Sequence, residues 1–224
     1  MHHRTVAELM TRNVVRAQRD MPFKEIVKLL AENDVTAVPV VDALDRPIGV
    51  VSEADLLRKS TAQADPAGRT PVPHLEAWER AKAEGARAEE LMSAPAVCAR
   101  PEWTVVEVAR LMEVQNVKRL PVVDETDRLQ GIVSRGDLLR VFLRSDDAIR
   151  DEITKDVLRE TLGPAASGVT VHVREGLITL GGSVEVENLI PVIERLCRSV
   201  DGVVSVSEHI AHGGDDSRKS PDGT

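Results

Sequence analysis

Aromatic residues and cysteines are scarce in this chain, and each shortage excludes a class of protein. Among 224 residues there are two Phe, two Trp and no Tyr, too few rings for the base-stacking surface of a single-strand binder. The two cysteines, Cys98 and Cys197, exclude a secreted disulfide scaffold. No apolar run approaches the roughly 20 residues of a membrane span, and the polar N-terminal stretch lacks the apolar core of a signal peptide. We therefore expect a cytoplasmic protein, free or at the periphery of a membrane.

Positive charge is in the minority. Lys and Arg number 29 against 37 Asp and Glu, a formal net charge of −8. Such a chain repels phosphate backbones at long range, so nucleic acid is not expected as a partner, although a local basic pocket for a small anion stays open. Apolar residues make up 42%, which suits a folded core built from Val, Leu, Ile and Ala.

A stretch of about fifty residues is present twice in the sequence. Residues 35–42 and 49–57 return, 82 positions later, as 117–124 and 131–139. Glu8-Leu9-Met10 returns with the same offset, and no gap is needed in between. A constant offset over this length indicates two copies of one structural unit.

The first copy predicts the order β-α-β-β-α. We expect a short strand at 14–15, then a helix that Asp20 caps and that has Pro22 in its first turn. The strands 38–41 and 48–51 follow, and Ser52 opens the last helix. In the second copy the long helix begins near Glu102 or Thr104. Between the copies, residues 61–86 are expected to form a linker, with an exposed helix over 75–90.

Beyond residue 145 the pattern changes to α-β-β-α-β. Apolar spacing predicts a helix over 146–162 that ends at Gly163-Pro164. A hairpin follows, with its turn at Glu175-Gly176. A second helix over 188–200 tolerates Pro191 only in its first turn; Gly202 is expected to cap it, before a last strand at 203–206. Residues 213–224 have no apolar content and are expected to be disordered. The fold class is therefore α/β, more closely α+β.

A Ser-x-x-Asp motif follows the last strand of each copy and admits two interpretations. The motif is Ser52 with Asp55, and Ser134 with Asp137. Ser before a helix with an acid three residues on is a variant of the capping box. The same hydroxyl can instead contact a phosphate at the helix N-terminus, and the carboxylate can accept hydrogen bonds from a ribose. The glycine before each motif would also let a ligand approach the backbone.

The duplicated motifs resemble a Bateman module, a pair of cystathionine-β-synthase-type (CBS) domains. The likeness rests on residues 38–42 with 49–55 and on 120–124 with 131–137, and it implies CBS domains at 5–60 and 87–143. Members of the family bind AMP, ADP, ATP or S-adenosylmethionine between the two domains, and they pair into homodimers through their helices. By resemblance, Ser52 and Ser134 contact phosphate, and Asp55 and Asp137 hold ribose. Adenine would lie between Asn13-Val14 and Ala37-Val38-Pro39 in one half, and between Pro95-Ala96 and Arg119-Leu120-Pro121 in the other.

The two halves differ in charge. Lys118, Arg119 and Arg135 in the second copy stand where the first has Thr36, Ala37 and Glu53. A buried phosphate needs compensating charge, so we expect the second half to bind the more anionic ligand and the first half to be weak or empty. The alternative is that Lys118 and Arg119 are ordinary surface charges.

Residues 146–212 resemble a BON domain. The likeness rests on the alternating valines of 169–173, on Gly176 to Gly182, and on the stretch 200–206. The resemblance implies contact with phospholipid or a membrane surface. Clustered basic residues are few, so attraction to lipid would be weak, and contact with a protein partner is an equal alternative.

Enzyme chemistry finds no support in the motifs. None of the six His is near a Cys, and no HExxH, CxxC, P-loop or nucleophile elbow is present. His209 and His212 have helical metal-ligand spacing, but a chance pair is the simpler explanation. We therefore expect a non-catalytic sensor with no cofactor other than its regulatory adenosyl ligand. The alternative is an envelope-associated adaptor that uses its BON-like domain.

Overall fold

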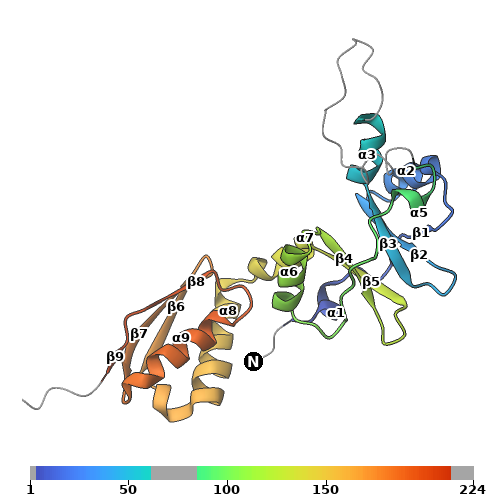
Figure 1. Cartoon of the computed structure of the whole chain (residues 1–224). Coiled ribbons are helices and arrows are strands. Elements are labelled where there is room, and N and C mark those ends of the chain that lie inside the picture. Colours follow the sequence, from blue (N-terminus) through green and yellow to red (C-terminus); the bar gives the residue numbers. More distant parts are fainter. Residues whose placement is uncertain (1–3, 62–84, 213–224) are drawn as a thin grey trace, which may run out of the picture. The chain divides into compact units, whose positions relative to one another are not determined.

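The computed structural model describes residues 4–61 and 85–212 (Figure 1). They form two compact units, residues 5–138 and residues 139–212 with Arg4. The expected tail at 213–224 and most of the expected linker helix lie outside the described residues. At the described end of that helix, residues 85–87 are not helical, and the short helix α5 spans Ala88–Leu91.

The first repeat contains a three-stranded sheet in the order β1-β2-β3, with β1 parallel and β3 antiparallel to β2. The expected strand at 14–15 is wrong, because pairing with β2 begins only where Ala17 lies opposite Val40. Pro22 itself, in an extended conformation, is the N-cap of α2, so Asp20 is not the cap. The elements are α1 (Val6–Leu9), β1 (Ala17–Gln18), α2 (Phe23–Glu32), β2 (Ala37–Val41), β3 (Pro47–Ser52) and α3 (Glu53–Thr61).

The second repeat reproduces this arrangement. Its first strand is reduced to a single parallel bridge, Ala99 to Val122, which is equivalent to Ala17 and Val40. Thr104 caps the long helix by accepting a hydrogen bond from the Glu107 amide, which decides between the two expected starts. The elements after α5 are α6 (Val105–Val114), β4 (Arg119–Val123), β5 (Leu129–Ser134) and α7 (Arg135–Leu139).

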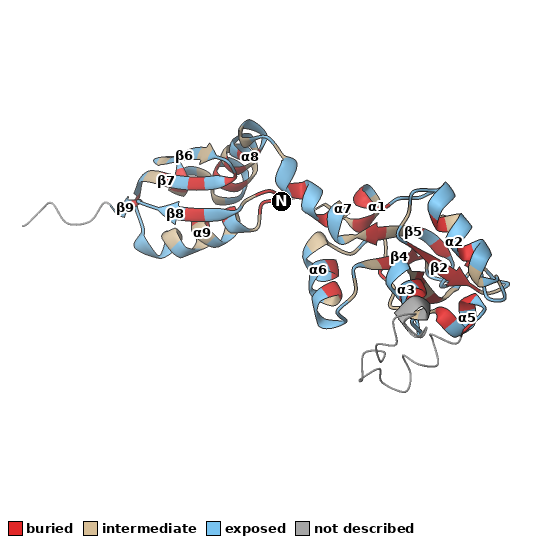
Figure 2. Ribbon diagram, turned by 90° about the horizontal axis from the view of Figure 1, so that it is seen from above, coloured by how far each residue is buried: buried red, intermediate tan, exposed pale blue. Residues whose placement is uncertain are grey.

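The segment that opens each repeat packs on the other repeat. Thr11 pairs with Ile132 of β5, and Ser93 pairs with Val50 of β3. The buried residues of α5 accordingly belong to the core of the first repeat, together with Ile26, Leu30 and the inward residues of the sheet. Figure 2 marks the buried residues of α2, β2 and α5 in red. The first repeat therefore has no complete core of its own.

The two glycines before the Ser-x-x-Asp motifs are explained by this exchange. A Cβ at Gly49 would lie 2.7 Å from Met92 Cγ and 2.9 Å from the Ser93 carbonyl oxygen. A Cβ at Gly131 would lie 2.9 Å from Met10 Cγ and 3.1 Å from the Thr11 carbonyl oxygen. The exchanged segments, and not a ligand, therefore occupy the space beside these glycines.

In the unit formed by residues 139–212, two long helical segments cover one face of a sheet with the order β6-β7-β8, and β9 pairs with the far end of β7 (Figure 1). The expected helix over 146–162 is an α-helix only to Glu152 and a π-helix over Ile153–Leu162. Pro191 lies in the first turn of α9, as expected, but Ser199, not Gly202, is the C-cap. The elements are α8 (Asp146–Glu152), β6 (Val169–Arg174), β7 (Leu177–Val184), α9 (Ile190–Arg198), β8 (Ser205–Glu208) and β9 (Ala211–His212).

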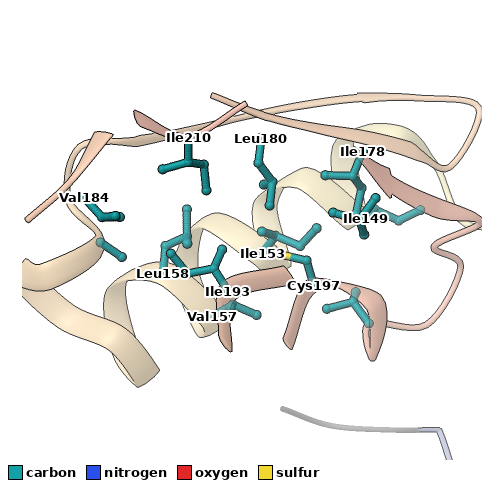
Figure 3. Packing of buried hydrophobic residues seen from close by; sticks show 13 residues of the cluster. Ile149, Ile153, Val157, Leu158, Ile178, Leu180, Val184, Ile193, Cys197 and Ile210 are labelled. Atoms are coloured by element: carbon teal, nitrogen blue, oxygen red, sulfur yellow. The ribbon is translucent and has the colours of Figure 1, made fainter. Parts of the chain in front are cut away.

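The core of this unit lies between the helices and β7. Figure 3 shows Ile149, Ile153 and Val157 from the helices facing Ile178 and Leu180 from the sheet. The strand expected at 203–206 is β8, which begins at Ser205, two residues later than expected, because Leu177 of β7 pairs with Ser205 and not with Val203. The short strand β9 that follows it was not expected. Burial raises the pKa of Cys197 to about 12, so this thiol behaves as a small apolar side chain.

Candidate functional site

Each Ser-x-x-Asp motif is closed on itself as a helix cap. Ser52 ends β3, and its hydroxyl donates to Asp55 Oδ2 at 2.6 Å while its amide donates to the same oxygen at 3.0 Å. In the second repeat the Ser134 hydroxyl and amide lie 2.7 and 2.9 Å from Asp137 Oδ2. Each Asp amide in turn donates to the Ser hydroxyl oxygen. The capping interpretation therefore holds in this structure, and a ligand would have to turn each hydroxyl away from its carboxylate.

The two turns differ in exposure. Asp55 is 5% exposed, and Arg58 Nη1 lies 3.2 Å from its Oδ1. Asp137 is only partly buried. Access for a polar ligand is therefore better at the second turn.

The predicted adenine-contacting residues gather at the same end of the strands as the serines. Ala37 pairs with Ser52, and Arg119 pairs with Ser134. The register of β1 with β2, continued three residues back, puts Val14 level with Ala37. The bridge from Ala99 to Val122 likewise puts Ala96 level with Arg119. Five of the predicted residues in these groups are buried: Ala37, Val38, Pro39, Leu120 and Pro121. Asn13 and Pro95 are exposed.

The strand that ends at Ser52 is tied to the segment from the second repeat. Ser93 and Val50 exchange two main-chain hydrogen bonds of 2.9 and 3.0 Å, and the Ala96 amide donates to the Ile48 carbonyl at 3.2 Å. Ala96, predicted to contact adenine in the second half, is therefore fixed on the first repeat.

The three predicted cations have different surroundings. Lys118 is exposed, so the surface-charge alternative suits it. Arg135 is also exposed, and its Nε donates to the Val117 carbonyl at 3.2 Å. Arg119 is partly buried and reaches across to the first repeat, where Nη1 donates to the Ala37 carbonyl at 3.4 Å and Nη2 donates to the Thr36 hydroxyl. Burial lowers the pKa of Arg119, and the carboxylates of Glu53 and Asp137 act in the opposite direction.

A groove of about 390 Å³ opens between α2 and α3, apart from the predicted site residues. Its walls are mostly apolar, and Val27 and Leu57 in them are 42% and 63% exposed. The sequence signal for it was present in these two apolar residues, which stand outside the core-facing positions of their helices. The lining residues are Phe23, Val27, Leu30, Ala31, Asp34, Val35, Thr36, Glu53, Leu56 and Leu57.

The described part of the chain contains no group of three His, Cys, Asp or Glu side chains placed closely enough to hold a metal ion. His209 and His212 lie in an extended segment that ends in β9 and not on a helix. Over residues 4–61 and 85–212, no helix has the length and apolar character needed to cross a bilayer.

Comparison with known families assigns both parts of the chain. The CBS domain model matches residues 6–61 and 88–144, and the BON domain model matches residues 145–213. The chain is a tandem CBS-domain protein with a C-terminal BON domain. An uncharacterized protein of Methanopyrus kandleri is 28% identical to this CBS-domain protein over 151 residues, which are 67% of this chain and 69% of the relative. The chloroplastic CBS domain-containing protein CBSX1 of Arabidopsis thaliana is 29% identical over 62% of this chain and 64% of its own length.

Solved structures agree with the fold of the CBS pair. The crystal structure of CBSX2 in complex with AMP superposes with a TM-score of 0.53 at 29% identity, over 62% of this chain and 96% of CBSX2. The CBS domain pair of protein MJ0100, solved with 5′-methylthioadenosine and S-adenosylmethionine, gives a TM-score of 0.51 at 21% identity, over 63% of this chain and 97% of that one. At that identity the second likeness shows the fold alone.

Proposed function

We propose that this protein is a non-catalytic sensor whose CBS pair binds an adenosine-containing ligand, AMP, ADP, ATP or S-adenosylmethionine, between its two repeats. The observation that carries the proposal is the likeness to CBSX2, solved with AMP, together with the two Ser–Asp turns that stand at equivalent ends of the two sheets. The ligand acts as a regulator and not as a cofactor, since the proposal includes no reaction.

The predicted residues contact three different parts of the ligand. The serine of each turn contacts phosphate and the aspartate accepts hydrogen bonds from the ribose hydroxyls. Adenine lies between aliphatic walls, because no aromatic ring is among the predicted residues, and main-chain groups of the strands read its edge. The Ser134–Asp137 half is favoured for a phosphate-bearing ligand, since Asp137 is less buried than Asp55 and the cations Arg119 and Arg135 stand where the first repeat has Ala37 and Glu53.

The ligand can transmit a signal only by binding one arrangement of the two repeats more tightly than another. A ligand shifts an equilibrium only if it binds one arrangement of the repeats better than the other. The exchanged segments connect the strand that ends at Ser52 to residues 93–96, so a change at one turn is passed to the opposite repeat through main-chain hydrogen bonds.

The groove between α2 and α3 supports the expected homodimer. Its exposed apolar residues, Val27 and Leu57, are suited to pack against the same surface of a second copy. Leu57→Glu should then convert the dimer to a monomer in sedimentation experiments.

The phospholipid or protein contact expected of the BON domain stays a prediction, tested by flotation of the full chain with anionic liposomes.

Calorimetry of the full chain with AMP, ATP, S-adenosylmethionine and adenosine tests the sensor function. We expect binding of at least one compound, and an affinity roughly tenfold weaker in Asp137→Ala, because two hydrogen bonds to the ribose are lost. Asp151→Ala, an exposed carboxylate in the other unit, is the matched control and should bind as the native chain does. Absence of binding to every compound would refute the proposal.

A further inference from the structure

Arg119 belongs to the second repeat by sequence and to both repeats by contact. Its backbone pairs with Ser134 across β4 and β5. Its guanidinium leaves that sheet and hydrogen-bonds the Ala37 carbonyl and the Thr36 hydroxyl of the first repeat. Ala37 is in turn the partner of Ser52 across β2 and β3. One side chain therefore links the two Ser–Asp turns.

The surroundings of this guanidinium are acidic on both sides. Glu53, directly after Ser52, and Asp137, three residues after Ser134, are the carboxylates that act on it. The hydrogen-bond partners of Arg119 are a carbonyl and a hydroxyl, both of the first repeat. The Thr36 carbonyl accepts from the Glu53 amide at 3.0 Å, so the acceptor residue is itself held at the first turn.

A phosphate is a better partner for this side chain than the acceptors it now has. A guanidinium forms two parallel hydrogen bonds to a phosphate, in which donor and acceptor carry opposite full charges and their geometries match. A carbonyl and a hydroxyl offer neither the charge nor the fork geometry. An adenosyl compound without a phosphate would leave the contacts of Arg119 with the first repeat in place.

We infer that Arg119 is a specificity-determining residue, a link between the repeats that a phosphate-bearing adenosyl ligand takes over and a phosphate-free one does not. This inference rests on the proposed function and deepens it. Ligands of the two classes then leave the repeats connected differently: AMP breaks the link to Thr36 and Ala37, whereas adenosine preserves it. The chain thereby distinguishes ligands by charge as well as by their base.

Four variants of the full chain test this, titrated calorimetrically with AMP and with adenosine. Arg119→Gln should weaken the affinity for AMP roughly tenfold and change the affinity for adenosine by less than twofold. Thr36→Val removes one acceptor of the link without changing charge, so it should strengthen AMP binding about two- to threefold and leave adenosine unchanged. Arg110→Gln removes an exposed cation of α6 and should match the native chain. Arg119→Lys keeps the charge without the fork and should fall between the native chain and Arg119→Gln.

The outcomes separate this inference from the sensor function. If AMP binds the native chain and Arg119→Gln binds it within twofold, the sensor function stands and the role of Arg119 is wrong. Equal weakening of AMP and adenosine by Arg119→Gln would also overturn it, because a structural role affects both ligands alike. Unchanged AMP binding by Thr36→Val would show that no link has to be broken. If neither ligand binds the native chain, the sensor function itself fails and the inference fails with it.

Discussion

Gly49 is the position at which the exchange of segments between the repeats can be tested most directly. In Gly49→Ala the new methyl group would lie 2.7 Å from Met92 Cγ and 2.9 Å from the Ser93 carbonyl oxygen. The methionine can rotate away, but the carbonyl is backbone and is fixed because Ser93 and Val50 exchange two hydrogen bonds. Overpacking of this kind costs about 1–3 kcal/mol. At about 3 °C per kcal/mol for a unit of this size, the melting temperature should fall by roughly 3–9 °C.

Three companion variants give the Gly49→Ala measurement its controls. Gly131→Ala should lower the melting temperature slightly less, since the equivalent contacts with Met10 and Thr11 are 0.2 Å longer, at 2.9 and 3.1 Å. In Gly136→Ala the new methyl group would lie 3.6 Å from the Ser134 hydroxyl oxygen, which is ordinary contact. As a helical alanine, this variant should be neutral or stabilising by up to about 1 kcal/mol. Met92→Ala combined with Gly49→Ala should recover part of the loss. Calorimetric melting of the full chain measures all four, and a Gly49→Ala protein as stable as the native one would refute the described packing.

Two further predictions concern polar contacts. Arg144 forms an ion pair with Glu152 at 2.7 Å and donates to the Asp201 carbonyl at 2.8 Å, and both side chains of the pair are 17% exposed. Arg144→Ala should therefore lower the free energy of unfolding by about 2–3 kcal/mol, whereas loss of the exposed pair of Arg150 with Asp147 should lower it by under about 1 kcal/mol. Equal losses in denaturant titrations would contradict this contrast. Hydrogen bonds from Thr126, Arg128 and Gln130 lower the pKa of Asp124 to about 2. A depressed carboxyl pKa stabilises the fold above its ordinary value of 3.8 and loses that effect as the pH falls through about 2. Asp124→Asn should therefore be less stable than the native chain at neutral pH, with a difference that narrows between about pH 4 and 2; a constant difference would count against it.

The repeat allowed most of the CBS pair to be predicted, because a constant offset fixes equivalent positions. Val38 to Val41, the Ser-x-x-Asp turns and the capped helix at Thr104 follow from local patterns that need no knowledge of the partner. The strand placed at Val14-Val15 failed because pairing with β2, and not apolar character, decides where a two-residue strand lies. Asp20 failed as a cap because the extended Pro22 already ends the loop before α2.

The exchange of segments could not be predicted from the duplicated sequence. Met10 and Met92 are equivalent residues, as are Gly49 and Gly131, so packing within a repeat and packing across repeats satisfy the same pattern. The hydrogen bond from Arg119 to Thr36 could not be predicted either, because the repeat pattern relates Arg119 only to Ser134 of its own repeat. The π-helix over Ile153–Leu162 was missed because apolar residues at 153, 157, 158 and 162 also suit an α-helix.

The exchanged segments have a consequence for any shortened form of the protein. A fragment that holds only the first repeat keeps residues 5–12, which belong on β5, and loses residues 87–96, which cover β3. Since Met10 and Thr11 are the equivalents of Met92 and Ser93, two such fragments can each supply the piece that the other is missing. A half-length chain should therefore fold as an interlocked pair, a domain-swapped dimer assembled from one repeat alone.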